Sequence, residues 1–213
     1  MKKSILITLP RYDDVTEYLS EFSKGLFEEA KKREINMRPL RDKEATRTNF
    51  ERTLQKLPCG MVFLNGHGSN SQILGHEREV LLDSDNIVML KDKIVYARSC
   101  ESGGELGKTF SNESKGCFIG YKRKFRFLAD SEWTANPSKD PVASLFIEPS
   151  NQVAVTLMKG HTSQEAYDNS KMHMLKSIKS VLKSEIQESF IISSELWNNF
   201  DGQVIYGNTE AKL

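Results

Sequence analysis

The sequence predicts an α/β protein with a mostly parallel, doubly wound central sheet, arranged as a three-layer α/β/α sandwich. From the start of the chain to Leu64, apolar runs of strand length alternate with amphipathic helical patterns in the order β-α-β-α-β. The runs are continuously apolar, as expected for strands that are buried on both faces. With 213 residues, of which 38% are hydrophobic, the chain is long enough for one well-cored domain over residues 1–213.

Each predicted strand is a short apolar run, rich in β-branched or aromatic residues, that ends at a turn or a proline. The first, Ser4–Leu9, ends at Pro10. The other main strands are expected over residues 35–40, 60–64, 93–98, 116–121 and 203–206. Residues 73–82 predict two short strands or a hairpin, inserted at the rim of the sheet.

Apolar residues at three- and four-residue spacing predict the helices. Helices are expected over residues 13–34, from Asp42 or Thr46 to Leu57, over 103–110, over 151–183 with a break near Gly160, and over 193–200, with a brief helical turn at 86–90. Residues 122–149 hold few periodic apolar residues, so they predict a long loop with some helix and a candidate for substrate contact. The tail, residues 209–213, is expected to be mobile.

Composition and charge argue against several classes of protein. No run of about 18 apolar residues is present for a membrane span, and the apolar run before Pro10 is shorter than a signal-peptide core of about 7 to 15 residues. Cys59, Cys100 and Cys117 form an odd set without CxxC spacing, which argues against a disulfide framework or a zinc cluster. We therefore expect a cytoplasmic protein without a membrane partner.

We expect no metal, no cofactor and no direct binding to nucleic acid. The net charge is only +1, and the basic run at residues 122–126 lacks the repeated aromatic residues typical of nucleic-acid binding. The histidines other than His67 show no metal-ligand spacing with one another or with the cysteines. The turn after Cys100 lacks the Lys-Ser/Thr of a P-loop.

A histidine and a cysteine follow two of the predicted strands at matching places. His67 stands in the turn after the strand at 60–64, and Cys100 in the turn after the strand at 93–98. Because the carboxyl ends of parallel strands meet at one edge of the sheet, an imidazole and a thiol are expected together there. A base beside a thiol is the core of a cysteine-nucleophile enzyme. The helix that follows Cys100 is expected to aim backbone N–H groups toward the thiolate and to favour it.

These residues carry a resemblance to a known family. A strand ending in Gly66-His67-Gly68-Ser69, an inserted hairpin, and a second strand ending in Ser-Cys-Glu-Ser-Gly resemble the caspase-type cysteine peptidases, which include caspases, legumains, separases, gingipains and clostripain. Residues 73–107 are most similar to bacterial CHAT domains, which are caspase-like domains. Glu101 follows the cysteine, and the spacing from His67 to Cys100 is shorter than in animal caspases, so their pattern does not transfer.

The resemblance implies a caspase-like fold and a mechanism. His67 would be the general base and acid, Cys100 the nucleophile, and the backbone N–H groups of Gly68 and Cys100 the oxyanion hole. No Asp or Glu in the motif is an obvious third member, so we expect a dyad. By analogy with similar bacterial proteins, the substrate would be a specific protein in a regulatory or defence pathway, and an activating protein partner, an ion or a cleavage could be needed.

The resemblance also places the substrate pocket beside the loop after the first strand and the segment that follows residue 121. The expected substrate-binding residues are Arg11, Asp13, Asp14, Asp130, Glu132 and Trp133. The four carboxylates could bind a Lys or Arg side chain, Arg11 could instead bind an acidic one, and Trp133 could wall the pocket. A basic residue before the cleaved bond is favoured.

Two other function classes remain open at this point. A non-catalytic CHAT-like adaptor would keep the fold and use it to bind a partner, although the intact His67 and Cys100 count against it. A flavodoxin-like domain that binds a small ligand would need neither residue to be reactive. A cysteine endopeptidase accounts for both residues, so it is the leading hypothesis.

Overall fold

The computed structural model describes residues 3–113, 115–184 and 188–213. In these residues the central sheet has six strands in the order β2-β1-β3-β6-β7-β8, and only β8 runs antiparallel to its neighbour. The strands are β1 Ser4–Leu9, β2 Asn36–Arg41, β3 Met61–Asn65, β6 Ile94–Arg98, β7 Cys117–Tyr121 and β8 Gln203–Gly207. Each lies within one residue of its predicted bounds, and the mostly parallel sheet is confirmed.

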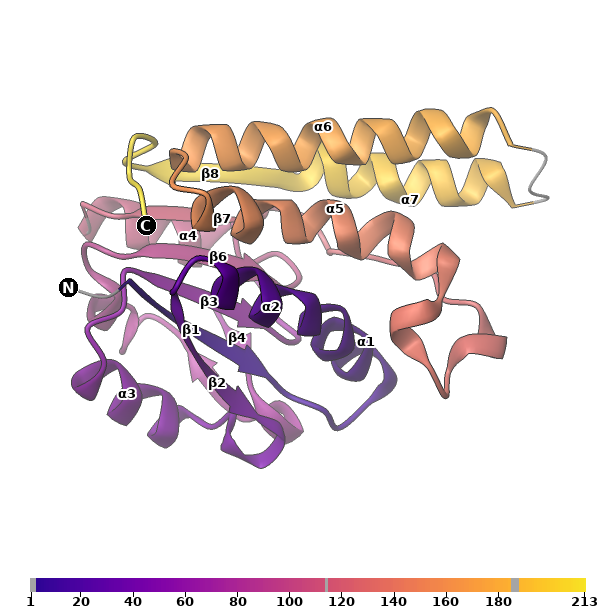
Figure 1. Ribbon diagram of the computed structural model, residues 1–213. Coiled ribbons are helices and arrows are strands. Elements are labelled where there is room, and N and C mark those ends of the chain that lie inside the picture. The colour runs from indigo at the N-terminus through magenta and orange to yellow at the C-terminus, as the bar shows by residue number, and fades with distance from the viewer. Residues whose placement is uncertain (1–2, 114, 185–187) are drawn as a thin grey trace.

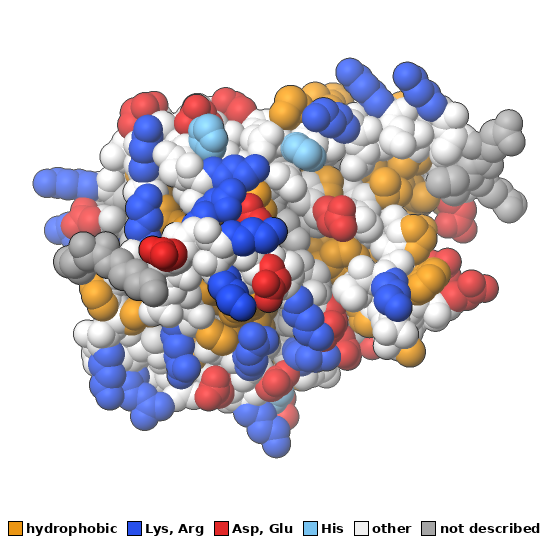
Figure 2. Space-filling view, viewed as in Figure 1, with side chains coloured by type: hydrophobic (Ala, Val, Ile, Leu, Met, Phe, Trp, Pro, Cys, Tyr) orange, Lys and Arg blue, Asp and Glu red, His pale blue; other side chains and the backbone are white. Residues whose placement is uncertain are grey.

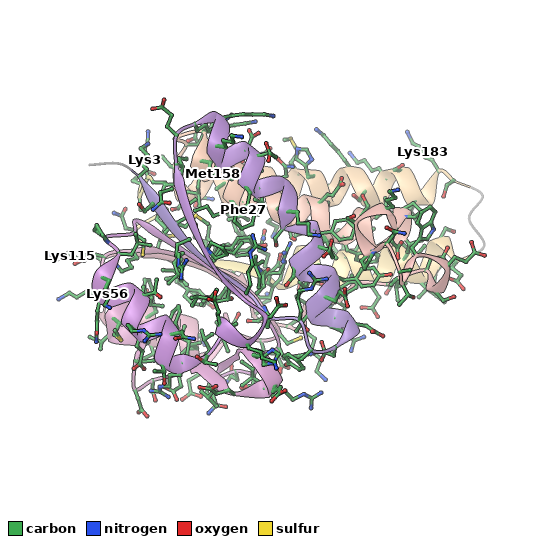
Figure 3. All side chains as sticks on the ribbon, turned by 60° about the horizontal axis from the view of Figure 1, so that its bottom comes forward. Lys3, Phe27, Lys56, Lys115, Met158 and Lys183 are labelled. Carbon is green, nitrogen blue, oxygen red and sulfur yellow. The ribbon has the colours of Figure 1, made fainter. Side chains whose placement is uncertain are left out.

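Helices pack on both faces of the sheet and so make three layers, with one hydrophobic cluster between the sheet and the helices on each face. Ile5 and Ile7 of β1 pack on one face with residues of α1, α2, α5, α6 and α7, whereas Leu6 packs on the other with residues of α3 and α4. Figure 3 shows α3, which carries Lys56, across the sheet from α2, which carries Phe27. The predicted α/β/α sandwich is therefore confirmed.

The helices follow the predicted pattern with three differences, one of which is that the last helix begins four residues before and ends two residues after the helix expected over 193–200. Their bounds are α1 Asp14–Phe22, α2 Lys24–Lys32, α3 Arg47–Lys56, α4 Glu105–Glu113, α5 Pro141–Met158, α6 Ser163–Leu182 and α7 Ser189–Gly202. The single helix expected over 13–34 is broken at Ser23, whose hydroxyl donates to Leu19 O at 2.7 Å. The loop expected up to residue 149 instead ends at Asp140, which caps α5, and Pro149 lies within that helix.

The insertion between β3 and β6 is the expected hairpin, formed by β4 (Ile73–Leu74) and β5 (Val80–Leu82). A 3₁₀ turn at Ile87–Leu90 matches the brief helical turn expected there. Thr46 rather than Asp42 caps α3, because its side chain accepts from the Asn49 amide.

The antiparallel pair of α6 and α7 extends past the carboxyl ends of the parallel strands (Figure 1). Figure 2 shows hydrophobic side chains on the surface near that end of the molecule. Leu182 at the end of α6, and Phe190 and Ile191 in the first turn of α7, are exposed. No helix of the described residues is long and apolar enough to cross a membrane.

The tail after β8 was expected to be mobile, and this prediction is wrong. The Ser163 and Gln164 amides, at the start of α6, donate to Ala211 O and Thr209 O, both at 2.9 Å. Leu213 packs against the core. The first amides of α6 lack partners within the helix, so the tail accepts hydrogen bonds from N–H groups that would otherwise be unpaired.

Candidate active site

His67 and Cys100 lie in neighbouring loops at the carboxyl edge of the sheet. Asn65 of β3 is in register with Arg98 of β6, and each reactive residue follows two positions later. The two loops are in direct contact, because a Cβ on Gly68 would lie 2.9 Å from both Cys100 O and Ser99 Oγ. Glycine at position 68 is therefore required by the close approach of the Cys100 loop.

His67 is held by a carboxylate that the sequence analysis did not assign to it. Its Nε2 lies 2.7 Å from Asp13 Oδ2, and Asp13 in turn caps α1, with Oδ1 accepting from the Thr16 amide at 2.9 Å. This pairing leaves the other ring nitrogen, Nδ1, without a partner among the described residues and able to accept a proton. The expectation of a bare dyad is corrected: the structure contains an Asp13–His67 pair.

The Asp13 carboxylate is suited to stay ionised. Partial burial acts to raise its pKa, but hydrogen bonds from the Thr16 amide and hydroxyl and from His67 outweigh burial, so the pKa is lowered from its ordinary value. A carboxylate with a lowered pKa keeps its charge at and above its ordinary pKa and loses it only as the pH falls through the lowered value. The His67 contact is therefore present over the whole neutral range.

The Cys100 side chain is directed toward the backbone of the loop after β7. Its Sγ donates to Phe125 O at 3.6 Å, and burial, with the nearby Glu101 charge acting in the same direction, raises its pKa. A thiol carries one proton, so in this arrangement Cys100 does not donate to the imidazole.

The helix after Cys100 was expected to aim backbone N–H groups toward the thiolate, but α4 begins only at Glu105. Its first amides are already used: Asn70, from the His67 loop, accepts from Glu105 N through Oδ1 and from Leu106 N through its carbonyl oxygen, both at 2.9 Å. The N-terminal end of α4 therefore binds Asn70 and does not favour the thiolate.

The two amides expected to form an oxyanion hole are free among the described residues. Ser69 N and Glu101 N donate to Gln72 O and Arg123 O, whereas the amides of Gly68 and Cys100 donate to no described group. Glu101, directly after Cys100, has a φ of 57°, a left-handed conformation that is costly for a residue with a side chain. Such strain is typical of a functional turn.

His67 and Cys100 open into one groove of about 600 Å³. Its walls come from the start of α1 and the loop after β7, with a contribution from α7. The other lining residues are Asp14, Val15, Tyr18, Phe125, Arg126, Phe127, Leu128, Ala129, Ser131, Thr134 and Glu195. A largely apolar groove with a few polar groups is typical of a substrate site.

Of the six residues expected to bind substrate, the structure brings only Asp14 into this groove beside His67 and Cys100. Asp13 instead binds His67. Arg11 pairs with Glu17 at 2.7 Å and with Glu21 at 2.9 Å, so it is not free to bind an acidic substrate side chain. The remaining three lie outside the groove lining: Asp130, Glu132 and Trp133.

Residues from α7 complete the site and were not anticipated from the sequence. Glu195 lines the groove and pairs with Arg126 at 2.9 Å. Asn199, one turn later, accepts from the Arg126 amide and donates to the Arg126 carbonyl oxygen. No motif marks these residues. The only signal for them in the sequence was that both stand on the polar face of a predicted helix.

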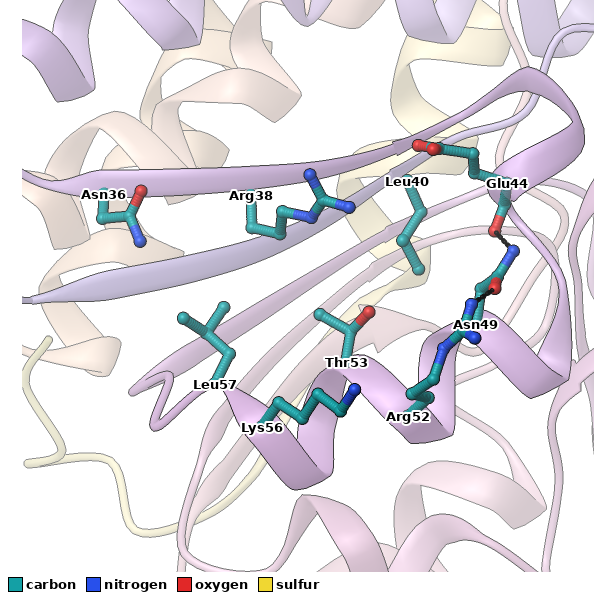
Figure 4. A pocket seen from close by; sticks show the side chains of 9 residues that line it. All are labelled: Asn36, Arg38, Leu40, Glu44, Asn49, Arg52, Thr53, Lys56 and Leu57. Atoms are coloured by element: carbon teal, nitrogen blue, oxygen red, sulfur yellow. Dashed lines mark hydrogen bonds between the residues drawn. The ribbon is translucent and has the colours of Figure 1, made fainter.

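A second cavity, of about 380 Å³, lies between the edge strand β2 and α3 (Figure 4). Arg38, Arg52 and Lys56 line it, but no cysteine or histidine does, so it lacks a nucleophile and base. Among the described residues, no group of three or more His, Cys, Asp and Glu side chains is placed to hold a metal ion.

Asp13→Asn is expected to lower kcat/KM for peptide cleavage by about 10²-fold or more, because with Oδ1 accepting from the Thr16 amide the asparagine turns its NH2 group, which only donates, toward His67 Nε2 and favours the wrong tautomer. Asparagine caps helices as well as aspartate does, so the free energy of unfolding should change little. Steady-state kinetics and urea unfolding test this. Glu17→Gln, on the same helix, is the control, and equal losses in both variants would contradict a positioning role for Asp13.

The fold defines the class of structure: a caspase-like α/β/α sandwich, as in the cysteine proteinase structures that the chain matches. The chain resembles gingipain R, an Arg-specific cysteine proteinase, with a TM-score of 0.62 and 11% identity over 99% of the chain. It also resembles the complex of the pro- and mature domains of Porphyromonas gingivalis RgpB, with a TM-score of 0.63 and 9% identity over 99% of the chain.

The chain spans about half of both matched structures, 47% and 48% of their lengths. At such low identity the likeness shows the fold alone. No protein-family model matches the sequence, and no curated protein matches it. The resemblance to CHAT domains therefore gains no support from these comparisons.

Proposed function

We propose that this protein is a cysteine endopeptidase in which Cys100 is the nucleophile and His67, positioned by Asp13, is the general base and acid. One observation carries the proposal: a carboxylate-held imidazole and a strand-end thiol open into the same largely apolar groove. The fold shared with gingipain R supports it.

In the proposed reaction, His67 Nδ1 takes the Cys100 proton as Sγ attacks the peptide carbonyl carbon and forms a C–S bond. The amides of Gly68 and Cys100 donate to the developing oxyanion. The C–N bond then breaks, and the amine leaves with the proton from His67. A water molecule, deprotonated by His67, attacks the thioester, and the acid product leaves as Sγ recovers its proton.

We place a basic residue before the cleaved bond. Gingipain R is Arg-specific, and the lining residues of the groove here include two carboxylates, Asp14 and Glu195. By analogy with CHAT proteases, the substrate is a specific cytoplasmic protein in a regulatory or defence pathway. The resting contact of the Cys100 thiol with Phe125 O suits an enzyme that is activated by a partner, an ion or a cleavage.

The test is a cleavage profile on a diverse peptide library, with and without calcium, read by mass spectrometry. It is run beside labelling with a peptidyl acyloxymethyl ketone that ends in arginine. We expect cleavage after basic residues and a covalent adduct on Cys100. Cleavage without an adduct would contradict the assigned nucleophile. Absence of both cleavage and adduct would favour the non-catalytic adaptor.

A further inference from the structure

The groove contains an ion pair that the proposed reaction does not use. Arg126, on the loop after β7, places Nη1 2.9 Å from Oε1 of Glu195 on α7. Both residues line the groove with Cys100. The side chain of Glu195 is 23% exposed and that of Arg126 is 52% exposed, so the carboxylate is the more sheltered partner of the ion pair.

The backbone of the Arg126 loop is held independently of this ion pair. Asn199 accepts from the Arg126 amide at 2.9 Å and donates to its carbonyl oxygen, and Asn198 donates to Lys124 O at 2.8 Å. Because these bonds fix the main chain, the Arg126 side chain can leave Glu195 without moving the groove wall. The pair is therefore separable at little structural cost.

The surroundings of Glu195 suit the side chain of an arginine or lysine. Phe125, Phe127 and Leu128 line the same groove and offer apolar surface to an aliphatic stem. A carboxylate in the lining of the same groove can bind the cationic head, and partial burial strengthens the attraction relative to water. Glu195 already binds a guanidinium in this structure.

Asp14 is the rival carboxylate in the groove. It is exposed and stands in the first turn of α1, where the positive end of the helix favours its charge. Glu195 is more sheltered and is already bound to a guanidinium. The geometry therefore favours Glu195 over Asp14.

We infer that Glu195 is the carboxylate that receives the basic side chain of the substrate, and that Arg126 occupies it in the unliganded protein as an internal substitute. The inference rests on the proposed function for its substrate class. In chemical terms, the substrate cation exchanges with Arg126 on the same carboxylate. A substrate without a cation at that position leaves the internal pair intact and gains nothing from Glu195.

The test uses paired peptides that carry either arginine or its neutral isostere citrulline before the cleaved bond. Glu195→Gln should lower kcat/KM for the arginine peptide about tenfold or more and leave the citrulline peptide unchanged. Arg126→Gln removes the competitor, so it should lower KM for the arginine peptide about threefold to tenfold. Asp14→Asn tests the rival carboxylate, and Asp168→Asn, on the exposed face of α6, is the matched charge control.

The charge swap Arg126→Glu with Glu195→Arg distinguishes recognition from structural support. It restores an ion pair and should switch preference from arginine peptides toward glutamate peptides. If the pair only supports the fold, both single variants will lower cleavage of all peptides equally and the swap will restore the original preference. That result, or a loss of arginine preference in Asp14→Asn alone, would overturn the inference.

Peptide binding to the Cys100→Ala protein, measured by fluorescence anisotropy, separates this inference from the proposed function. Glu195-dependent binding of the arginine peptide, without cleavage by the wild type, would sustain the inference and refute the peptidase. Cleavage that is unaffected by Glu195→Gln would sustain the peptidase and refute the inference. Absence of binding to any variant would refute the inference.

Discussion

Cys100→Ala and His67→Ala are each expected to lower kcat/KM for the best library peptide by about 10⁴-fold or more. In the proposed reaction the first removes the atom that attacks the carbonyl carbon, and the second removes the acceptor for its proton. The two effects should not add in the double variant, because nucleophile and base act in one step. Steady-state cleavage of that peptide by the wild type and the three variants measures this.

The other two cysteines provide the matched control. Cys59→Ala and Cys117→Ala remove buried thiols that do not line the groove, so a substrate bound there cannot reach either of them. Cleavage should persist in both variants when rates are compared at equal concentrations of folded protein. Activity that survives in Cys100→Ala but disappears in Cys59→Ala would refute the assignment of the nucleophile.

Arg98→Met is expected to lower the free energy of unfolding by about 4 kcal/mol. Arg98 is fully buried at the end of β6, and its five N–H groups donate to five acceptors without a carboxylate among them. The acceptors are Asn65 Oδ1, Ser150 Oγ, Asn151 Oδ1, Leu19 O and Ser23 Oγ. Methionine fills much of the volume but leaves buried acceptors unpaired.

Arg98 keeps its charge at neutral pH even though burial lowers its pKa to about 10. Arg98→Lys therefore preserves the charge but supplies fewer donors with different geometry, and we expect a smaller loss of about 2 kcal/mol. Arg33→Met, which removes a surface pair with Glu29, should cost less than about 1 kcal/mol. Urea unfolding of all three variants tests the order, and similar losses for Arg98→Met and Arg33→Met would contradict it.

The sheet and the positions of His67 and Cys100 could be predicted from the sequence because both depend on local patterns. Continuous apolar runs mark strands that are buried on both faces, and each run here stops at a small-residue turn. Parallel strands then bring the two turns to one edge without any knowledge of side-chain packing. The break at Ser23 was missed because it depends on a hydroxyl bond and on the buried Arg98.

The partner of His67 could not be predicted from local patterns. Asp13 stands 54 residues before His67 and has a sufficient local role as the cap of α1, so nothing in the sequence indicates a second one. The sheet order offered a signal, since the loop after β1 lies beside the loop after β3. The sheet order does not place Glu195 and Asn199 in the site, because their roles depend on how α7 packs against the loop after β7.

Asn70 links the loop that carries His67 to the helix that follows the Cys100 turn. Asn70 follows His67 by three residues and binds the helix that begins five residues after Cys100. Any displacement of the histidine turn must therefore carry the cysteine turn with it. The main chain around Phe125 is bound both to α7 and to the cysteine turn, where Glu101 N donates to Arg123 O at 3.0 Å. Adjustment to a substrate therefore falls to side chains such as that of Arg126, while the backbone that surrounds the groove keeps its position.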